Sequence, residues 1–199
     1  MFKKLLSVGL IIAVSVPAYA ASNLDTLLGR IHSLKADFIQ AMSGQSQMMQ
    51  QSSGTLSIAE PNRFRWQVNS PNQQLFVSDG KQVWNDEQDL NQVTVTPLNT
   101  SLSATPLLLL SGRVKDVNEV FKVTALSHDR YRFTPKSGDE LVQNIVLTFV
   151  GALPSELVVT NSLGQVTDIR FSHVELNPSL DPGLFEFTPG PDDDVLSNS

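Results

Sequence analysis

Hydrophobic and polar residues alternate along most of this chain. In the run 63–69, Phe64, Trp66 and Val68 alternate with charged or amide side chains, which is the period of a half-buried strand. The same period recurs in short runs at Leu56/Ile58, Val93/Val95, Phe121/Val123, Tyr131/Phe133, Ile145/Leu147/Phe149, Leu157/Val159, Ile169/Phe171 and Phe185/Phe187. Turn signals separate the runs at 79–80, 137–139 and 161–164. Many short strands with few helices predict a mainly β fold, built on a strongly curved antiparallel sheet.

A helix is predicted at the start of this β-rich region. Ser22 with Asp25 three residues later is typical of a helix N-terminus. Apolar residues follow at helical spacing, namely Leu24, Leu27, Leu28, Ile31 and Leu34. We expect this amphipathic helix to lie on the sheet and help to close it, with the two-residue period starting at about residue 36.

The β pattern is interrupted between residues 98 and 120. Thr105 as N-cap, Pro106 at the first helical position and Gly112 just after the end predict a short helix that carries Leu107 to Leu110. Four consecutive leucines cover most of the circumference of a helix, so they cannot all face one sheet. Pattern alone leaves two interpretations open, a plug buried in the core or a cover over an apolar site. A second helical piece is expected over residues 114–120.

The first twenty residues have the pattern of an export signal. Lys3 and Lys4 precede an apolar run over 5–16, and Ala18 and Ala20 flank Tyr19. Such a pattern predicts a signal peptide over 1–20, cleaved after Ala20. The remaining residues, 21–199, are expected to form a single soluble domain, because neither a linker nor a repeat divides them.

Charge and composition narrow the function further. The net charge of −6 becomes −8 without residues 1–20, since that stretch holds two basic residues and no acidic one. Nucleic acid is therefore not an expected partner, because its binding depends on Lys and Arg. Binding to an anionic membrane surface is not expected either, because it requires a basic face on the protein. The chain has no cysteine, so disulfides, thiol nucleophiles and thiolate metal sites are excluded.

Catalytic patterns are weak throughout the sequence. His32, His128 and His173 are scattered over different predicted elements, and no serine or aspartate stands at a spacing that predicts a nucleophile beside a base. Residues 78–81 lack the glycines of a phosphate loop and are better interpreted as a turn. The acidic run 192–194 lacks the other ligands of a calcium loop. We therefore expect no enzyme activity, no metal and no cofactor.

Several segments together resemble one known family. They are Pro61-Asn62-Arg63-Phe64-Arg65-Trp66, Ser78 to Trp84, Thr105 to Leu110, and Phe185-Glu186-Phe187-Thr188-Pro189. In this order and spacing they resemble LolA, the outer-membrane lipoprotein carrier family. The resemblance implies an unclosed β-barrel of about eleven strands whose mouth is covered by helices, enclosing a hydrophobic cavity. It also implies a periplasmic carrier that binds the acyl chains of lipoproteins.

The resemblance assigns roles to particular residues. Phe64 and Trp66 match a strand of the family's cavity, and Leu107, Leu108, Leu109 and Leu110 match its lid helix. Our hypothesis is that the curved sheet supplies the cavity wall through Phe38, Phe64, Trp66, Phe76 and Trp84, while the four leucines move aside to admit acyl chains. Better-known members have an arginine, thought to hold the lid closed, at the position of Glu60 here. An ionised carboxylate accepts hydrogen bonds but does not donate them. Glu60, Arg63 and Arg65 are therefore candidates for lid control, and the closing mechanism stays open.

Partners also follow from the resemblance. It implies loading by an inner-membrane ABC transporter of the LolCDE type and delivery to an outer-membrane receptor similar to LolB, with the carrier acting as a monomer. No nucleotide-binding motif is present to drive release. An alternative from another functional class is a periplasmic regulatory module of the same fold that senses lipoproteins by protein contacts.

Overall fold

The computed structural model describes residues 19–43, 50–98, 106–111, 114–136 and 141–197. Its helices are α1 (Tyr19–Leu28), α3 (Leu108–Ser111) and α4 (Val114–Val120), with short 3₁₀ helices η1 (Gln88–Leu90) and η2 (Pro182–Phe185). The strands are β1 (Ser33–Ser43), β2 (Gln50–Ala59), β3 (Arg63–Ser70), β4 (Gln74–Asp79), β5 (Gln82–Glu87), β6 (Gln92–Pro97), β7 (Phe121–Ala125), β8 (Arg130–Pro135), β9 (Val142–Val150), β10 (Leu153–Asn161), β11 (Val166–Leu176) and β12 (Asp194–Ser197). The mainly β prediction is confirmed.

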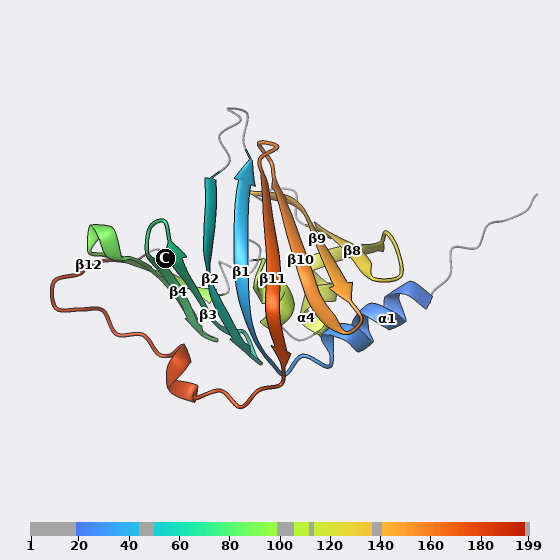
Figure 1. Cartoon of the computed structure of the whole chain (residues 1–199), viewed down its shortest axis with the longest axis horizontal. Helices are drawn as coiled ribbons and strands as arrows, with labels where there is room; N and C mark the ends of the chain where they lie inside the picture. The colour runs from blue at the N-terminus through green and yellow to red at the C-terminus, as the bar shows by residue number, and fades with distance from the viewer. Residues whose placement is uncertain (1–18, 44–49, 99–105, 112–113, 137–140, 198–199) are drawn as a thin grey trace, which may run out of the picture.

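All these strands belong to one curved sheet (Figure 1). Their order is β12-β6-β5-β4-β3-β2-β1-β11-β10-β9-β8-β7. The edge strands β12 and β7 are not paired with each other, so the barrel is unclosed, as predicted. Every pairing is antiparallel except that of β12 with β6, which differs from the all-antiparallel expectation.

Buried and exposed side chains alternate along the first strand of the sheet. In β1, Leu34, Ala36 and Phe38 are buried while Lys35 and Asp37 are exposed. Strand pairing places these buried residues on the same face as the apolar residues of β2, β3, β9, β10 and β11. We call this the inner face. It carries most of the main hydrophobic core, which also includes residues from α1 and α3.

The N-terminal helix is shorter than predicted. It ends at Leu28, and Leu34 already belongs to β1. The Gly29 N–H bonds to the Asp25 carbonyl oxygen at 2.9 Å, and the chain then turns into the strand. Gly is favoured just after a helix end, so it explains why the apolar spacing through Leu34 was misleading. At the other end, α1 begins at Tyr19, before the predicted cleavage point.

Helix α1 is fastened to the β7–β8 half of the sheet (Figure 1). Its Leu24, Leu27 and Leu28 are buried. The Asn23 side-chain amide donates hydrogen bonds to the Tyr131 hydroxyl at 3.0 Å and to a backbone carbonyl at 2.9 Å. The prediction that this helix lies on the sheet is therefore confirmed for its described side chains.

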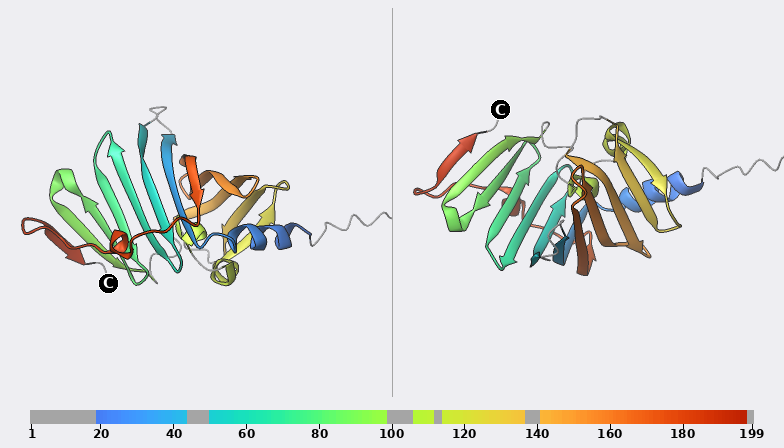
Figure 2. Two further views of the ribbon diagram at one scale, coloured as in Figure 1. Left: turned by 60° about the horizontal axis from the view of Figure 1, so that its bottom comes forward. Right: turned by 90° about the horizontal axis from the view of Figure 1, so that it is seen from above.

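A strand predicted at Phe185/Phe187 is wrong. Phe185 ends η2, in which Pro182 follows the N-cap Asp181 and the Asp181 carboxylate accepts a hydrogen bond from the Gly183 N–H. Residues 177–193 form a strap that crosses the sheet to reach β12 at the far edge (Figure 2, left). Because the chain crosses the sheet in this way, β12 enters beside β6 in the parallel direction.

Candidate functional site

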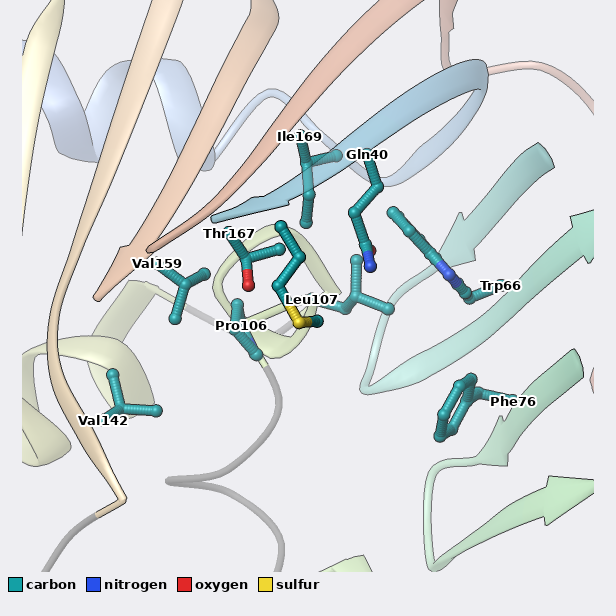
Figure 3. A pocket seen from close by; sticks show the side chains of 10 residues that line it. Gln40, Trp66, Phe76, Pro106, Leu107, Val142, Val159, Thr167 and Ile169 are labelled. Carbon is teal, nitrogen blue, oxygen red and sulfur yellow. The ribbon is translucent and has the colours of Figure 1, made fainter. Parts of the chain in front are cut away.

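A cavity of about 310 Å³ lies between the inner face of the sheet and the start of the lid segment. Figure 3 shows its lining, which comes from strands far apart in the sequence. The lining residues are mainly apolar: Gln40, Met42, Trp66, Phe76, Pro106, Leu107, Val142, Val159, Thr167 and Ile169. The volume is at the lower end of the range of roughly 300–1,000 Å³ typical of ligand pockets. The sheet thus leaves space beside its core for an apolar guest.

A second, larger cavity adjoins the first. Its volume is about 500 Å³, and Gln40, Met42, Trp66 and Phe76 line both. Its other lining residues are mostly polar: Gln50, Gln51, Ser52, Val68, Pro71, Asn72 and Gln74. No ionisable side chain among the described residues lines either cavity. The site therefore has an apolar part and an uncharged polar part that meet at four shared residues.

Trp66 is held in the cavity wall by stacking. Its ring lies on Phe38 with centroids 3.5 Å apart and planes 19° from parallel. Phe38 pairs with Gly54 in β2, where a Cβ atom would approach the Phe38 ring to 2.8 Å and overlap the carbonyl oxygen of Gln67. Only glycine leaves room for this arrangement. Phe38, which lies on the same inner face, thus holds the Trp66 ring in its position in the cavity wall.

Of the five predicted cavity residues, two line the cavities, two are buried in the core and one, Trp84, lies elsewhere. Trp66 and Phe76 line both cavities. Phe38 and Phe64 are buried in the main core, and neither is among the lining residues of these two cavities.

Trp84 lies on the opposite, outer face of the sheet. It pairs with Val77, which in turn pairs with Arg65, and its ring is 6.2 Å from that of Phe187 in the strap. The predicted place of Trp84 in the cavity wall is wrong. Alternation along β5 puts its neighbour Val83 on the inner face and Trp84 on the outer face.

The lid leucines are all buried in this structure. Leu107, Leu108, Leu109 and Leu110 have exposed fractions of 7%, 5%, 2% and 2%. Of these, Leu107 lines the smaller cavity, and all four belong to the main core. The helix α3 that carries the last three is as short as predicted, and α4 spans the predicted residues 114–120. Thr105 and Gly112 lie outside the described residues. The four leucines thus pack into the main core, and Leu107 also forms part of the cavity wall.

The end of α3 is fastened by a backbone hydrogen bond. The N–H of Asn62 donates to the carbonyl oxygen of Ser111, the last residue of α3, at 2.7 Å. Asn62 has the left-handed conformation, with φ of 58°. Its own carbonyl oxygen accepts a hydrogen bond from the buried Ser78 hydroxyl at 2.8 Å. The turn at residues 60–62, which we call the latch turn, therefore holds the end of α3 and is itself held from β4.

Of the three predicted lid-control residues, Glu60 belongs to this turn, whereas Arg63 and Arg65 lie in β3. The hydrogen bond to α3 is made by Asn62 instead. The Glu60 carboxylate lies 2.9 Å from Nδ1 of His32. Arg63 donates to the Glu60 carbonyl oxygen at 2.7 Å and lies 5.4 Å from the centre of the Phe185 ring. Arg65 donates to the Leu184 carbonyl oxygen at 3.4 Å. Both arginines thus face the strap on the outer side, as alternation from Phe64 predicts.

Sequence reasoning missed most of the polar lining. Gln40 and Thr167 stand at inward positions of β1 and β11. Extending the alternation of Leu34, Ala36 and Phe38 by one step would have placed Gln40 inside. This polar residue at an apolar position was the available signal. Val142 carried no such signal, because it is the first residue of its strand.

The remaining histidine contacts are at the surface. His173 Nδ1 lies 2.8 Å from the Asp37 carboxylate, and both side chains are more than half exposed. No group of metal-binding side chains is found in the described part of the chain. Among the same residues, no helix is both long and apolar enough to cross a bilayer.

The fold and the site define an unclosed-barrel protein with an apolar cavity beneath a short, leucine-rich helix. The chain belongs to the LolA family, since residues 29–188 match the model described as outer membrane lipoprotein carrier protein LolA. It is 37% identical to an outer-membrane lipoprotein carrier protein of Alcanivorax borkumensis, over 98% of both chains. A protein of the same description from Azotobacter vinelandii is 36% identical, also over 98% of both chains.

Solved structures show the same fold at low sequence identity. A LolA superfamily protein from Nitrosomonas europaea superposes with a TM-score of 0.54 at 11% identity, covering 84% of this chain and 97% of that one. An uncharacterised conserved protein from Thermus thermophilus superposes with a TM-score of 0.55 at 14% identity, covering 90% and 99%. The resemblance found in the sequence motifs is thereby confirmed at the level of family and fold.

Proposed function

We propose that this protein is a periplasmic carrier that holds the acyl chains of lipoproteins in the apolar cavity and passes them towards the outer membrane. The observation that supports this most directly is the cavity between Trp66, Ile169 and Leu107. The relatives described as outer-membrane lipoprotein carrier proteins support the same role. No catalytic step is part of the proposal.

The physical need for such a cavity follows from the cost of exposing hydrocarbon to water. Each exposed CH₂ group costs about 0.8 kcal/mol, so a single long acyl chain costs roughly 10 kcal/mol. A closed cover of leucines prevents the empty site from presenting this surface to water. When this cover opens, Leu107 loses contacts with the core of the protein and gains contacts with the bound acyl chain.

The family also suggests where the cargo comes from and goes to. In this proposal an inner-membrane ABC transporter of the LolCDE type loads the carrier, and a receptor similar to LolB accepts the lipoprotein. The carrier acts as a monomer. Release then requires only that the receptor bind the acyl chains more tightly than the carrier does. A cavity lined by uncharged residues and covered by a movable helix suits such moderate binding.

The proposal is tested by release of lipoprotein from membranes. Membranes containing a lipidated substrate and the transporter are incubated with ATP and the mature protein. A soluble one-to-one complex of carrier and lipoprotein is expected. A lipoprotein that stays on the membrane in the presence of folded carrier contradicts the proposal.

Two neighbouring residues of β10 provide a matched pair of variants. Val159 lines the cavity, whereas Val158 pairs with Asp168 on the outer face, and both are half-buried. Val159→Lys places a charge beside the acyl chains, and it should reduce lipoprotein release at least tenfold. Val158→Lys should release normally. Thermal unfolding confirms that both variants are folded.

A further inference from the structure

The wall of the apolar cavity contains an amide and a hydroxyl side chain, those of Gln40 and Thr167, that have no hydrogen-bond partner among the described residues. Gln40 and Thr167 are half-buried among apolar lining residues. Figure 3 shows the Gln40 amide and the Thr167 hydroxyl directed into the cavity. Within the described part of the chain, neither side-chain group takes part in a hydrogen bond. Besides the indole N–H of Trp66, these are the side-chain groups of the apolar cavity able to donate a hydrogen bond to a bound ligand.

The two donors come from neighbouring strands. Gln40 in β1 pairs with Ile169 in β11, and Met42 pairs with Thr167. Gln40 and Thr167 are therefore diagonal neighbours on the inner face, with Cα atoms roughly 7–8 Å apart in regular sheets. A long glutamine side chain can shorten the distance between the donors. Their separation suits two hydrogen-bond acceptors that lie a few bonds apart.

Hydrocarbon alone would be a poor ligand at this position. Packing CH₂ groups against an amide leaves its N–H without a partner, which costs free energy. A carbonyl oxygen accepts the hydrogen bond and removes this cost. The chemistry at Gln40 thus distinguishes an acyl group, which ends in a carbonyl, from an alkyl chain of equal length.

Gln40 also lies where the two cavities meet. It lines both the apolar cavity and the polar one that contains Gln50, Gln51, Asn72 and Gln74. A ligand with its carbonyl at Gln40 can extend its chain towards Val159 and Ile169. The polar part of the same ligand then faces the amide side chains of the larger cavity. This arrangement gives the ligand one preferred direction.

We propose that Gln40 and Thr167 form a carbonyl-binding site for the ester groups of a diacylated lipid anchor, with Gln40 as the main donor. This inference rests on the proposed function, because it names how the acyl chains are recognised in that same cavity. The site selects acyl esters over ethers and fixes the head of the anchor at the junction of the cavities.

The test compares an ester with an ether of equal chain length. The probes are 1,2-dioctanoylglycerol and its 1,2-dioctyl ether, whose affinities are measured by displacement of a fluorescent apolar dye from the purified protein. The native protein should bind the ester about tenfold more tightly, because the bound ether covers the half-buried amide of Gln40 without accepting its hydrogen bond. Gln40→Met should lower ester affinity about tenfold and leave ether affinity unchanged. Thr167→Val should lower ester affinity severalfold.

The control is a glutamine on the outer face. Gln67 is half-buried in β3 and pairs with Thr55 and Leu75, and Gln67→Met should keep the native preference. Equal affinity of the native protein for ester and ether would overturn the inference and leave the proposed function standing. Binding of neither probe would overturn both.

A spectroscopic measurement covers the case in which Gln40→Met is unstable. An ester labelled with ¹³C at the carbonyl should show a lower carbonyl stretching frequency when bound to the native protein than in hydrocarbon solvent. In Thr167→Val, part of this shift should be lost. A bound ester with the frequency found in hydrocarbon solvent would show that neither donor contacts the carbonyl.

Discussion

At the scale of single residues, the face of the sheet on which a side chain lies determines its role. Trp66 and Trp84 are the two tryptophans of the chain, and each lies in a strand of the same half of the sheet. Trp66 stacks on Phe38 and lines the cavity. Trp84 contacts Phe187 of the strap. The same residue type therefore lines the cavity at one position and contacts the strap at the other.

Asp86 is a residue whose ionisation opposes folding. It is 7% exposed on the outer face of β5. Burial raises the pKa of its carboxyl group, a hydrogen bond from Gln88 acts in the opposite direction, and the charge of Asp193 raises the pKa further. A raised pKa means that the folded state favours the protonated acid. Its contribution to stability is complete below the ordinary aspartate pKa, and it is lost as pH rises through the raised value.

Replacing this carboxyl group should therefore change how stability depends on pH. Asp86→Asn is expected to raise the melting temperature at pH 7, because the amide removes the cost of burying a carboxyl group that ionises in the unfolded chain. The gain should shrink as pH falls towards 3.8, the ordinary value of the group. Differential scanning calorimetry at several pH values measures the effect, with the exposed Asp89→Asn as a control. A gain that is equal at pH 4 and pH 7 would contradict the assignment.

At the scale of elements, the short helix α3 depends on the latch turn. Burial of the four leucines 107–110 holds this segment against the core, but packing alone does not fix the end of the helix. The hydrogen bond from Asn62 to Ser111 does so. Asparagine adopts the left-handed conformation more readily than most residues. Glu60, whose carboxylate lies beside His32, is thus not needed as a donor to the lid.

The latch turn can be weakened without touching the cavity. Asn62→Val places a β-branched residue at φ of 58°, which costs about 1–2 kcal/mol. The lid should open more often, so the amide hydrogens of residues 107–111 should exchange severalfold faster in hydrogen-exchange mass spectrometry. Asn62→Gly tolerates the same conformation and should exchange almost as slowly as the native protein. Similar exchange in the valine and glycine variants would show that the latch turn does not hold the lid.

At the scale of the whole molecule, the sheet carries a core on each face. The inner core surrounds the cavity. On the outer face, Leu75, Val77 and Val93 are buried together with Phe185 of the strap, outside the main core. Arg63 lies against the Phe185 ring, at 5.4 Å from its centre. The inner face can therefore stay incompletely filled while the outer core stabilises the same strands.

Removal of the aromatic ring of the strap should separate stability from binding. Phe185→Ala deletes a side chain that is 2% exposed, and such changes destabilise proteins by about 3–5 kcal/mol. Urea unfolding should show a loss in this range. The fraction that remains folded should bind acyl probes with native affinity. The exposed Val195→Ala serves as a control. Unchanged stability would mean that the strap is only loosely attached.

Local patterns were sufficient to predict much of the fold. Alternation around Phe64 gave the strand and its buried face, and the breaker Pro106 with the leucine run indicated a short helix. The position of Trp84 and the strap were not predictable in this way, since they depend on which strands pair and on how residues 177–193 cross the sheet. Thr167 and Gln40 meet only through the long-range pairing of β1 with β11. Pairs of this kind are set by topology, which local periodicity does not contain.

The most direct test of the account is to locate the acyl chain inside the carrier. A lipoprotein whose acyl chains end in a photoreactive diazirine is loaded onto the protein, irradiated, and mapped by mass spectrometry. Adducts are expected on the cavity residues Leu107, Val159 and Ile169. Adducts confined to the outer face, at Trp84 or Phe187, would contradict the claim that the cavity beneath the lid holds the chains.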